Sequence, residues 1–383
     1  MESINFSANT HNCLLALGPE SDGNFSVFYK GVIYRSESFG DLLSEENFQK
    51  LIQTVAKFLK NNRAKPNIIL TDLHPLYRTT ILGESLSKKY KANHIKVQHH
   101  IAHVFSAIGD KIVQEPGYGL QVTGYGIACD GTGYGLDRKI WGGELFKIKS
   151  KKEKVKSIER IGHLENQILI GGDLAVNEPA RMLISILDKF MSKDKLYRLV
   201  KKYYSRNQFE LLYNQLQQNF NCQETSSTGR ILDAVSVLLG FSGNVRKYKH
   251  SPAILLEKNS TRPYKDLEPE IKRITGYGLW VTGYGIMTTP LFEYLVKNIN
   301  RDKRRLAATA QLYIAQGLYK VLKLEAKSSK LKAGFFAGGI ANNKIIASYL
   351  ERKGVYSSKK ISRGDAGVSF GQIVYYLLAD SGD

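Results

Sequence analysis

The chain has 383 residues, of which 43% are hydrophobic, so it is long enough to bury a large core shared by two lobes. Its formal net charge of +20 suits an anionic ligand, an acidic protein or a nucleic acid, but the basic residues are spread along the chain and we rank general lysine enrichment first. No apolar run approaches the roughly 18 residues of a membrane helix, and the three scattered cysteines argue against a disulfide framework or CxxC zinc fingers. We therefore expect a cytoplasmic protein with no signal peptide and no membrane partner, and we rank a nucleic-acid partner low without excluding it.

The first part of the chain predicts a mixed sheet with crossover helices. The apolar spacing predicts, in order, strands at 14–18, 24–29 and 32–34, a helix at 45–61, a strand at 67–71, a helix at 81–89 and a strand at 94–97. Lys30-Gly31 is typical of a hairpin turn between the second and third of these strands.

A histidine-rich segment follows, reading Val97-Gln98-His99-His100-Ile101-Ala102-His103-Val104. On a helix, His99 and His103 share one face and His100 is turned aside. Two imidazoles one turn apart form half of a divalent-metal site, which a carboxylate from elsewhere would complete. A helix with surface histidines explains the segment equally well, so the segment alone does not decide between the two.

Glycine-rich turns at strand ends favour phosphate binding. Asp130-Gly131-Thr132-Gly133 would expose backbone N–H groups and leave the Asp130 carboxylate free for a metal, although Asp-Gly is also a strong hairpin signal. Gly338-Gly339 lies between an apparent strand and a helix start that includes Asn342, where backbone N–H groups could approach a nucleotide. Asp365, in a loop flanked by glycines, is our candidate for the carboxylate that completes the metal site, with a helix N-cap as the alternative.

We expect residues 150–330 to be mainly helical. Within them, Gly171-Gly172-Asp173 and Glu178 either cap helices or hold ribose hydroxyls. Two near-identical 11-residue segments, 117–127 and 276–286, are better explained as hairpins extending each lobe than as aromatic lids.

Together these segments resemble one family, the C-terminal carbamoyltransferase domain of the hydrogenase maturation factor HypF. The resemblance is collinear from about residue 14 to residue 376. It rests on Asp72-Leu73-His74-Pro75, Gln98-His99-His100-Ile101-Ala102-His103, Asp130-Gly131-Thr132-Gly133-Tyr134-Gly135, Trp141-Gly142-Gly143-Glu144, Gly171-Gly172-Asp173-Leu174-Ala175, Glu178-Pro179, Ser226-Ser227 with Gly229-Arg230 and Asp233-Ala234, and Asp365, Gly367, Ser369 and Gly371-Gln372.

The resemblance implies an α/β fold of two ribonuclease H-like lobes, as in the actin, sugar-kinase and heat-shock chaperone superfamily, with a helical insertion and with nucleotide and metal between the lobes. We divide the chain into an N-terminal lobe, 1–150, and a C-terminal lobe, 151–383. The implied metal, zinc or iron, is held by His99, His103 and Asp365, with Asp130 as a further candidate ligand. The implied nucleotide-binding residues are Gly131, Thr132, Gly133, Gly171, Gly172, Asp173, Glu178, Gly338, Gly339 and Asn342, and the implied catalytic residues are Asp130, His100 and Arg230.

The activity that the resemblance implies is transfer of a carbamoyl group from carbamoyl-adenylate, made from ATP, to a C-terminal cysteine of a HypE-like acceptor. Nothing in the chain resembles a domain that makes carbamoyl-adenylate, so we expect a separate synthase subunit. Two positions depart from the family pattern: Asp22 stands where the pattern has lysine, and Lys249 stands where it has an acid. A related transferase that puts threonylcarbamoyl on tRNA and a non-catalytic nucleotide-binding partner protein are the alternative interpretations.

Overall fold

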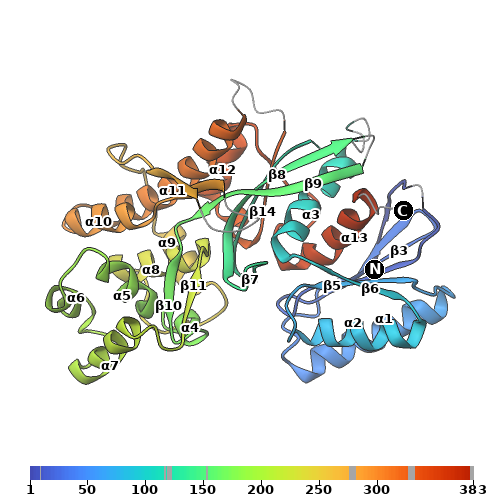
Figure 1. Cartoon of the computed structure of the whole chain (residues 1–383), viewed down its shortest axis with the longest axis horizontal. Coiled ribbons are helices and arrows are strands. Elements are labelled where there is room, and N and C mark those ends of the chain that lie inside the picture. The colour runs from blue at the N-terminus through green and yellow to red at the C-terminus, as the bar shows by residue number, and fades with distance from the viewer. Residues whose placement is uncertain are drawn as a thin grey trace.

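The computed structural model describes residues 1–8, 10–115, 118, 123–151, 154–275, 282–326 and 333–379. It contains two mixed sheets, with helices packed on them and between them (Figure 1). The two-lobed α/β arrangement expected from the sequence is therefore confirmed.

The first sheet has six strands in the order β1-β4-β3-β2-β5-β6. Their bounds are β1 Glu2–Asn5, β2 Leu14–Leu17, β3 Phe25–Tyr29, β4 Val32–Arg35, β5 Ile68–Asp72 and β6 Asn93–Val97. β2 pairs antiparallel with β3 and parallel with β5, so the sheet is mixed. Helices α1 (Glu45–Asn61) and α2 (Arg78–Tyr90) lie on one face of it (Figure 1).

The second sheet is built on three long strands, β7 (Gly124–Tyr134), β8 (Ile140–Lys151) and β9 (Lys154–Leu164), in the order β12-β13-β9-β8-β7-β14-β15. The shorter strands are β10 Gln167–Ile170, β11 Cys222–Thr225, β12 Ile271–Thr275, β13 Thr282–Ile286, β14 Gly334–Ala337 and β15 Tyr356–Ser357. β10 and β11 form a pair that joins this sheet through β8.

Most of the remaining helices pack around the second sheet in one large apolar core. They are α4 Leu174–Asn177, α5 Ala180–Asp188, α6 Lys193–Val200, α7 Arg206–Gln217, α8 Thr228–Leu239, α9 Ser251–Lys258, α10 Thr289–Lys297, α11 Lys303–Ala326 and α12 Lys344–Arg352. None of the helices in the described ranges is both long enough and apolar enough to cross a membrane.

Helices α3 (His99–Gln114) and α13 (Val368–Leu378) pack against each other, with the first sheet on one side and β7 and β14 on the other (Figure 1). Their close approach depends on Gly371, because a Cβ atom there would lie 1.9 Å from the carbonyl oxygen of Ala102. α3 begins with the histidine pair, and α13 follows the loop that carries Asp365. The packing of these two helices therefore sets the spacing of the predicted metal ligands.

Several predicted elements agree closely with the structure. The helix predicted at 45–61 is α1, and Lys30 and Gly31, both with positive φ, form the turn between β3 and β4. The prediction that residues 150–330 are mainly helical misses β9 to β13, whose strands are short or highly charged and give a weak alternation signal.

The sheets divide the chain earlier than the boundary placed at residue 150. β7 and β8 come before that boundary but lie at the centre of the second sheet, because apolar alternation predicts a strand without telling which sheet it joins. The near-identical 11-residue segments lie partly outside the described residues. Their described ends are the start of β7 and the strand β13, which pairs antiparallel with β12.

Candidate metal centre

The histidine pair stands at the N-terminus of α3, whose first turn is fixed by the Gln98 side chain accepting a hydrogen bond from the Ile101 N–H. One helical turn separates His99 from His103, and both rings are buried. Their Nε2 atoms lie 3.1 Å apart, so the two rings converge on one point as the spacing predicts.

Two carboxylates from distant segments reach the same point. Asp130 comes from β7, and its Oδ2 lies 3.3 Å from His99 Nε2 and 3.2 Å from His103 Nε2. Asp365 comes from the loop before α13, and its Oδ1 lies 3.7 Å and 3.5 Å from the same two nitrogens. One ligand atom from each of the four residues lies within 4.8 Å of the other three. Two imidazole nitrogens and two carboxylate oxygens form a donor set that suits zinc or iron.

The carboxylates in this cluster shift the pKa values of the two rings. Burial alone would lower the pKa of His99, but the carboxylates of Asp72, Asp130 and Asp365 outweigh burial and raise it. Burial and the neighbouring His99 would lower the pKa of His103, but hydrogen bonds to Asp130 and Asp365 outweigh them and raise it. Burial alone would raise the pKa of Asp130, yet hydrogen bonds from His103 and His99 hold it well below its usual range. A divalent cation bound here would replace the ring protons as the partner of the carboxylates.

Asp72, at the end of β5, orients the first histidine. Its Oδ2 lies 2.7 Å from His99 Nδ1, and its Oδ1 accepts a hydrogen bond from the His74 backbone N–H. Because Nδ1 is held by this carboxylate, the Nε2 atom is the one left for a metal. This carboxylate–histidine pair is a feature of metal sites that the sequence analysis missed, although the position of Asp72 at a strand end was a usable signal.

His100 lies beside the cluster and is not part of it. Burial and the neighbouring His99 lower its pKa to about 3, so it is neutral at ordinary pH. Its Nδ1 is 3.0 Å from Gln98 Nε2, and its Nε2 has no hydrogen-bond partner among the described residues. Arg230, another residue implied to be catalytic, is buried behind the Gly131 turn and pairs with Asp233 at 2.7 Å. The catalytic roles given to His100 and Arg230 stay predictions.

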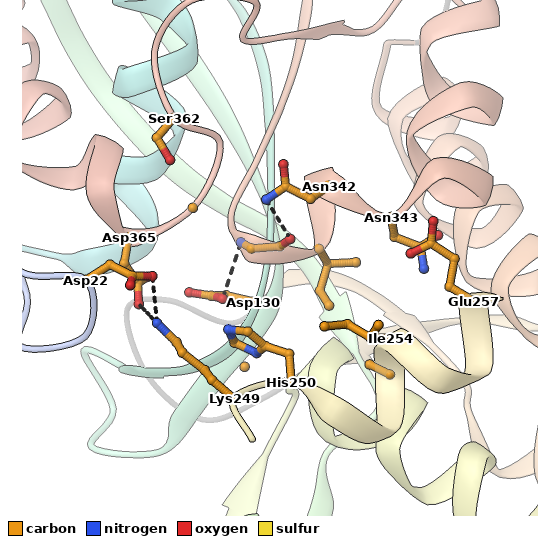
Figure 2. Close-up of a pocket in the computed structure, with 15 residues that line it drawn as sticks. Asp22, Asp130, Lys249, His250, Ile254, Glu257, Asn342, Asn343, Ser362 and Asp365 are labelled. Carbon is orange, nitrogen blue, oxygen red and sulfur yellow. Dashed lines mark hydrogen bonds and ion pairs between the residues drawn. The ribbon is translucent and has the colours of Figure 1, made fainter. Parts of the chain in front are cut away.

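A cavity of about 340 Å³ opens next to the cluster (Figure 2). Its lining includes Asp130 and Asp365, and three of the predicted nucleotide-binding residues, Gly131, Gly339 and Asn342. The Gly339 N–H donates a hydrogen bond to Asp130 Oδ1 at 3.3 Å. This bond connects the turn of Gly338 and Gly339 to the candidate metal ligands. Gly338, with φ of +92°, must be glycine because a Cβ atom would lie 2.2 Å from the Cys129 carbonyl oxygen.

The other predicted nucleotide-binding residues lie elsewhere. Thr132 is exposed on β7, and Gly133 packs against the rings of His99 and His100. Gly171 and Gly172 form a turn of positive φ before α4, followed by the exposed Asp173. Glu178 pairs with Arg181 at 2.9 Å and accepts a hydrogen bond from the Tyr204 hydroxyl. None of these six lines the cavity, and a ribose contact by Asp173 or Glu178 stays a prediction.

Two of the lining residues that were not predicted to reach the cavity form an ion pair there. Asp22 comes from the turn between β2 and β3, and Lys249 from the segment before α9; the ammonium and the carboxylate pair at 2.7 Å. Their only signal in the sequence was that both depart from the pattern of the resembled family.

The chain matches two family models that together span most of its length. Residues 9–110 match the HypF Kae1-like domain, and residues 126–372 match the second subdomain of the carbamoyltransferase Kae1-like domain. The chain belongs to the HypF family. The resemblance stated from its motifs is thereby confirmed.

Relatives show how much of a HypF protein this chain resembles. It is similar to the probable carbamoyltransferase HypF of Methanocaldococcus jannaschii, with 35% identity over 98% of this chain and 48% of that relative. A crystal structure of full-length HypF in a phosphate- and nucleotide-bound form superposes with a TM-score of 0.85 at 26% identity, over 98% of this chain and 47% of that one. The chain therefore spans about half the length of these two HypF proteins.

A shorter relative has nearly the same extent as this chain. The carbamoyltransferase HypF homolog of Cupriavidus necator is 26% identical over 96% of this chain and 92% of that relative.

Proposed function

We propose that this chain transfers a carbamoyl group from carbamoyl-adenylate to a cysteine thiol of a HypE-like acceptor, in the maturation of nickel–iron hydrogenase. The observation that carries the proposal is the convergence of two histidines and two carboxylates at the edge of a cavity, in a chain of the HypF family. We place the reaction in the cytoplasm, where an acceptor thiol stays reduced.

In this proposal His99, His103, Asp130 and Asp365 hold zinc or iron. The metal would serve as a Lewis acid toward a carbamoyl or phosphate oxygen. Asp72 keeps the His99 ring in the orientation that presents Nε2, and the burial of both rings keeps bulk water from competing for the site. Asp130, for which the sequence implies both a catalytic role and a further candidate ligand, acts in this proposal as the fourth ligand.

The adenylate would occupy the neighbouring cavity. Gly131, Gly339 and Asn342 line it and would contact the nucleotide, with the backbone of the glycine turn free to approach phosphate oxygens. The volume of the cavity falls in the range of small-molecule sites, roughly 300–1,000 Å³. The phosphate and nucleotide that the related HypF crystal structure contains support this assignment.

The proposed reaction balances without a redox partner. The thiol sulfur attacks the carbamoyl carbon, a carbon–sulfur bond forms, and the bond from that carbon to the phosphate oxygen breaks. AMP leaves with the bonding electron pair, and the thiol proton passes to the released phosphate or to water. The products are a protein thiocarbamate and AMP. Carbamoyl-adenylate reacts readily with water, so direct transfer within a closed complex with the enzyme that makes it would protect it.

We further propose that the adenylate comes from a separate synthase subunit. The high positive charge would favour docking to an acidic partner.

Reconstitution tests the proposal. With carbamoyl phosphate and ATP alone, the isolated chain should transfer almost nothing; adding a carbamoyl-AMP synthase domain should give thiocarbamate on a HypE-type acceptor, detected by mass spectrometry. Asp365→Ala should abolish transfer in that system while leaving the circular dichroism spectrum unchanged. Full transfer by the lone chain would refute the separate synthase, and no transfer to any acceptor would favour a non-catalytic nucleotide-binding protein.

A tRNA acceptor is the second candidate, because a net charge of +20 suits nucleic acid. The same reconstitution, supplied with a threonylcarbamoyl-adenylate source and tRNA, discriminates between the two. Modified tRNA without modified protein would replace the first candidate by the second.

A further inference from the structure

The charges that line the cavity are unbalanced. Asp22, Asp130, Glu257 and Asp365 contribute four carboxylates. Lys249 is the one lysine or arginine among the described residues of the lining. An anionic ligand that enters this cavity therefore has a single side-chain ammonium to meet, besides any metal and the backbone N–H groups.

Lys249 lies at the end of the cavity nearest the metal cluster (Figure 2). Its Nζ is 2.7 Å from Asp22 Oδ2 and 3.7 Å from Asp365 Oδ2. The oxygen of Asp365 that faces the histidines is the other one, Oδ1. The ammonium thus stands on the cavity side of a metal ligand, where it can reach a ligand that bridges cavity and metal.

The ion pair itself contributes little to stability. The side chains of Lys249 and Asp22 are 41% and 49% exposed, and half-exposed pairs of this kind are screened by water and salt. The ion pair between Lys249 and Asp22 is therefore better explained as a means of positioning the ammonium than as a source of fold stability.

The backbone beside Lys249 is also held in an uncommon conformation. His250 has φ of +64° and ψ of 11°, in the left-handed region that non-glycine residues rarely adopt, and it caps the N-terminus of α9. Arg246 Nη2 lies 3.2 Å from His250 Nδ1 and holds that turn. Lys249 is therefore presented by a fixed turn that leads into a helix.

The two partners exchange the charges that the family pattern predicts for their positions. By the resemblance stated from the motifs, Asp22 stands where the pattern has a lysine on the first lobe, and Lys249 stands where it has an acid on the second. In the structure these two departures contact each other, so each compensates for the other and one ammonium remains at this end of the cavity. Compared with the family pattern, the ammonium comes from the second lobe instead of the first.

We infer that Lys249 is a ligand-binding residue: its ammonium pairs with the phosphate of a nucleotide in the cavity. Asp22 holds that ammonium in place. The inference rests on the proposed nucleotide binding. It predicts that the loss of Lys249 weakens binding of a phosphate-bearing ligand and spares the corresponding nucleoside, because the nucleoside offers no anionic oxygen.

The test uses the full chain with its metal bound, titrated with AMP and with adenosine by calorimetry. Lys249→Gln should weaken AMP binding about tenfold, leave adenosine binding unchanged and leave the metal content unchanged. Lys247→Gln is the matched control: it removes the same charge two residues away, from a side chain outside the cavity lining, and should change neither affinity.

A charge exchange tests the role of the pair. Lys249→Glu alone should lose AMP binding, and Asp22→Lys together with Lys249→Glu should recover most of it, since the ammonium is then supplied from the first lobe. Failure of the parent protein to bind AMP would overturn both the proposed nucleotide site and this inference. AMP binding by the parent that Lys249→Gln leaves unchanged, or that falls equally for adenosine, would overturn this inference alone.

Discussion

The Nδ1 atom of His99 lies 2.7 Å from the Oδ2 atom of Asp72, although β5 and α3 are separated along the chain by a helix and another strand. Both residues are buried, so this contact is formed away from water. It leaves the Nε2 atom of His99 facing His103, Asp130 and Asp365. The first sheet therefore contacts the candidate metal centre through one carboxylate, without supplying any of its four candidate ligands.

Asp72→Asn should weaken metal binding by about 10- to 100-fold, because the amide cannot hold the His99 ring as the carboxylate does. Metal affinity measured by competition with a chromophoric chelator checks this. Asp41→Asn, which changes an exposed carboxylate ahead of α1, serves as the control. Unchanged affinity in Asp72→Asn would show that the contact does not orient the ligand.

Asp130→Asn should reduce the metal content as much as Asp365→Asn does, because both carboxylates lie at similar distances from the two histidine nitrogens. His103→Ala should reduce it further, since a whole ligand side chain is removed. Metal analysis of the purified variants provides the measurement. A full metal complement in Asp130→Asn would return Asp130 to a catalytic role and leave three ligands.

The convergence of His99 and His103 was predictable from sequence because it is local: both lie on one helix, and an i,i+4 spacing fixes their geometry. Asp130 and Asp365 were identified as strand-end and loop carboxylates, but their meeting depends on how α3, α13 and β7 pack. The pair formed by Asp22 and Lys249 could not be predicted, because it joins two turns that no periodicity relates. The sheet that β7 and β8 join could not be predicted either, because apolar alternation predicts a strand without telling its neighbours.

Asp110, on α3, connects that helix to the loop that carries Asp365. Its carboxylate accepts hydrogen bonds from the Tyr356 hydroxyl and from the backbone N–H groups of Lys359, Lys360 and Ile361, at 2.6–3.1 Å. Asp110→Asn replaces one acceptor oxygen by a donor, so it should destabilise the fold by about 2 kcal/mol. It should also lower the metal affinity, because the loop before Asp365 loses its anchor.

Urea unfolding and chelator competition measure these two effects. Asp41→Asn, which changes an exposed carboxylate ahead of α1, is again the control and should change neither. If Asp110→Asn lowers stability and keeps full metal affinity, the position of Asp365 is set by α13 packing instead.

Glu144, on β8, is fully buried between the sheet and the helices. It pairs with Arg160 at 2.6 Å and accepts a hydrogen bond from the Ser226 hydroxyl. Burial would raise the pKa of Glu144, but the Arg160 guanidinium outweighs burial and lowers it to about 2. A folded-state pKa below the unfolded value near 4.5 means that the ionised Glu144 stabilises the fold above pH 4.5 and that this contribution is lost as pH falls towards 2.

Glu144→Gln should therefore cost on the order of 3 kcal/mol at pH 6, and its difference from the parent protein should shrink as pH falls below 4.5. Urea unfolding midpoints at pH 6, 4 and 3 provide the measurement. Glu159→Gln, which removes a half-exposed partner of Lys149 on the adjacent strand, should show only a small difference at every pH. A Glu144→Gln deficit that stays constant from pH 6 to pH 3 would mean that the side chain acts through packing and hydrogen bonding, with its charge contributing nothing.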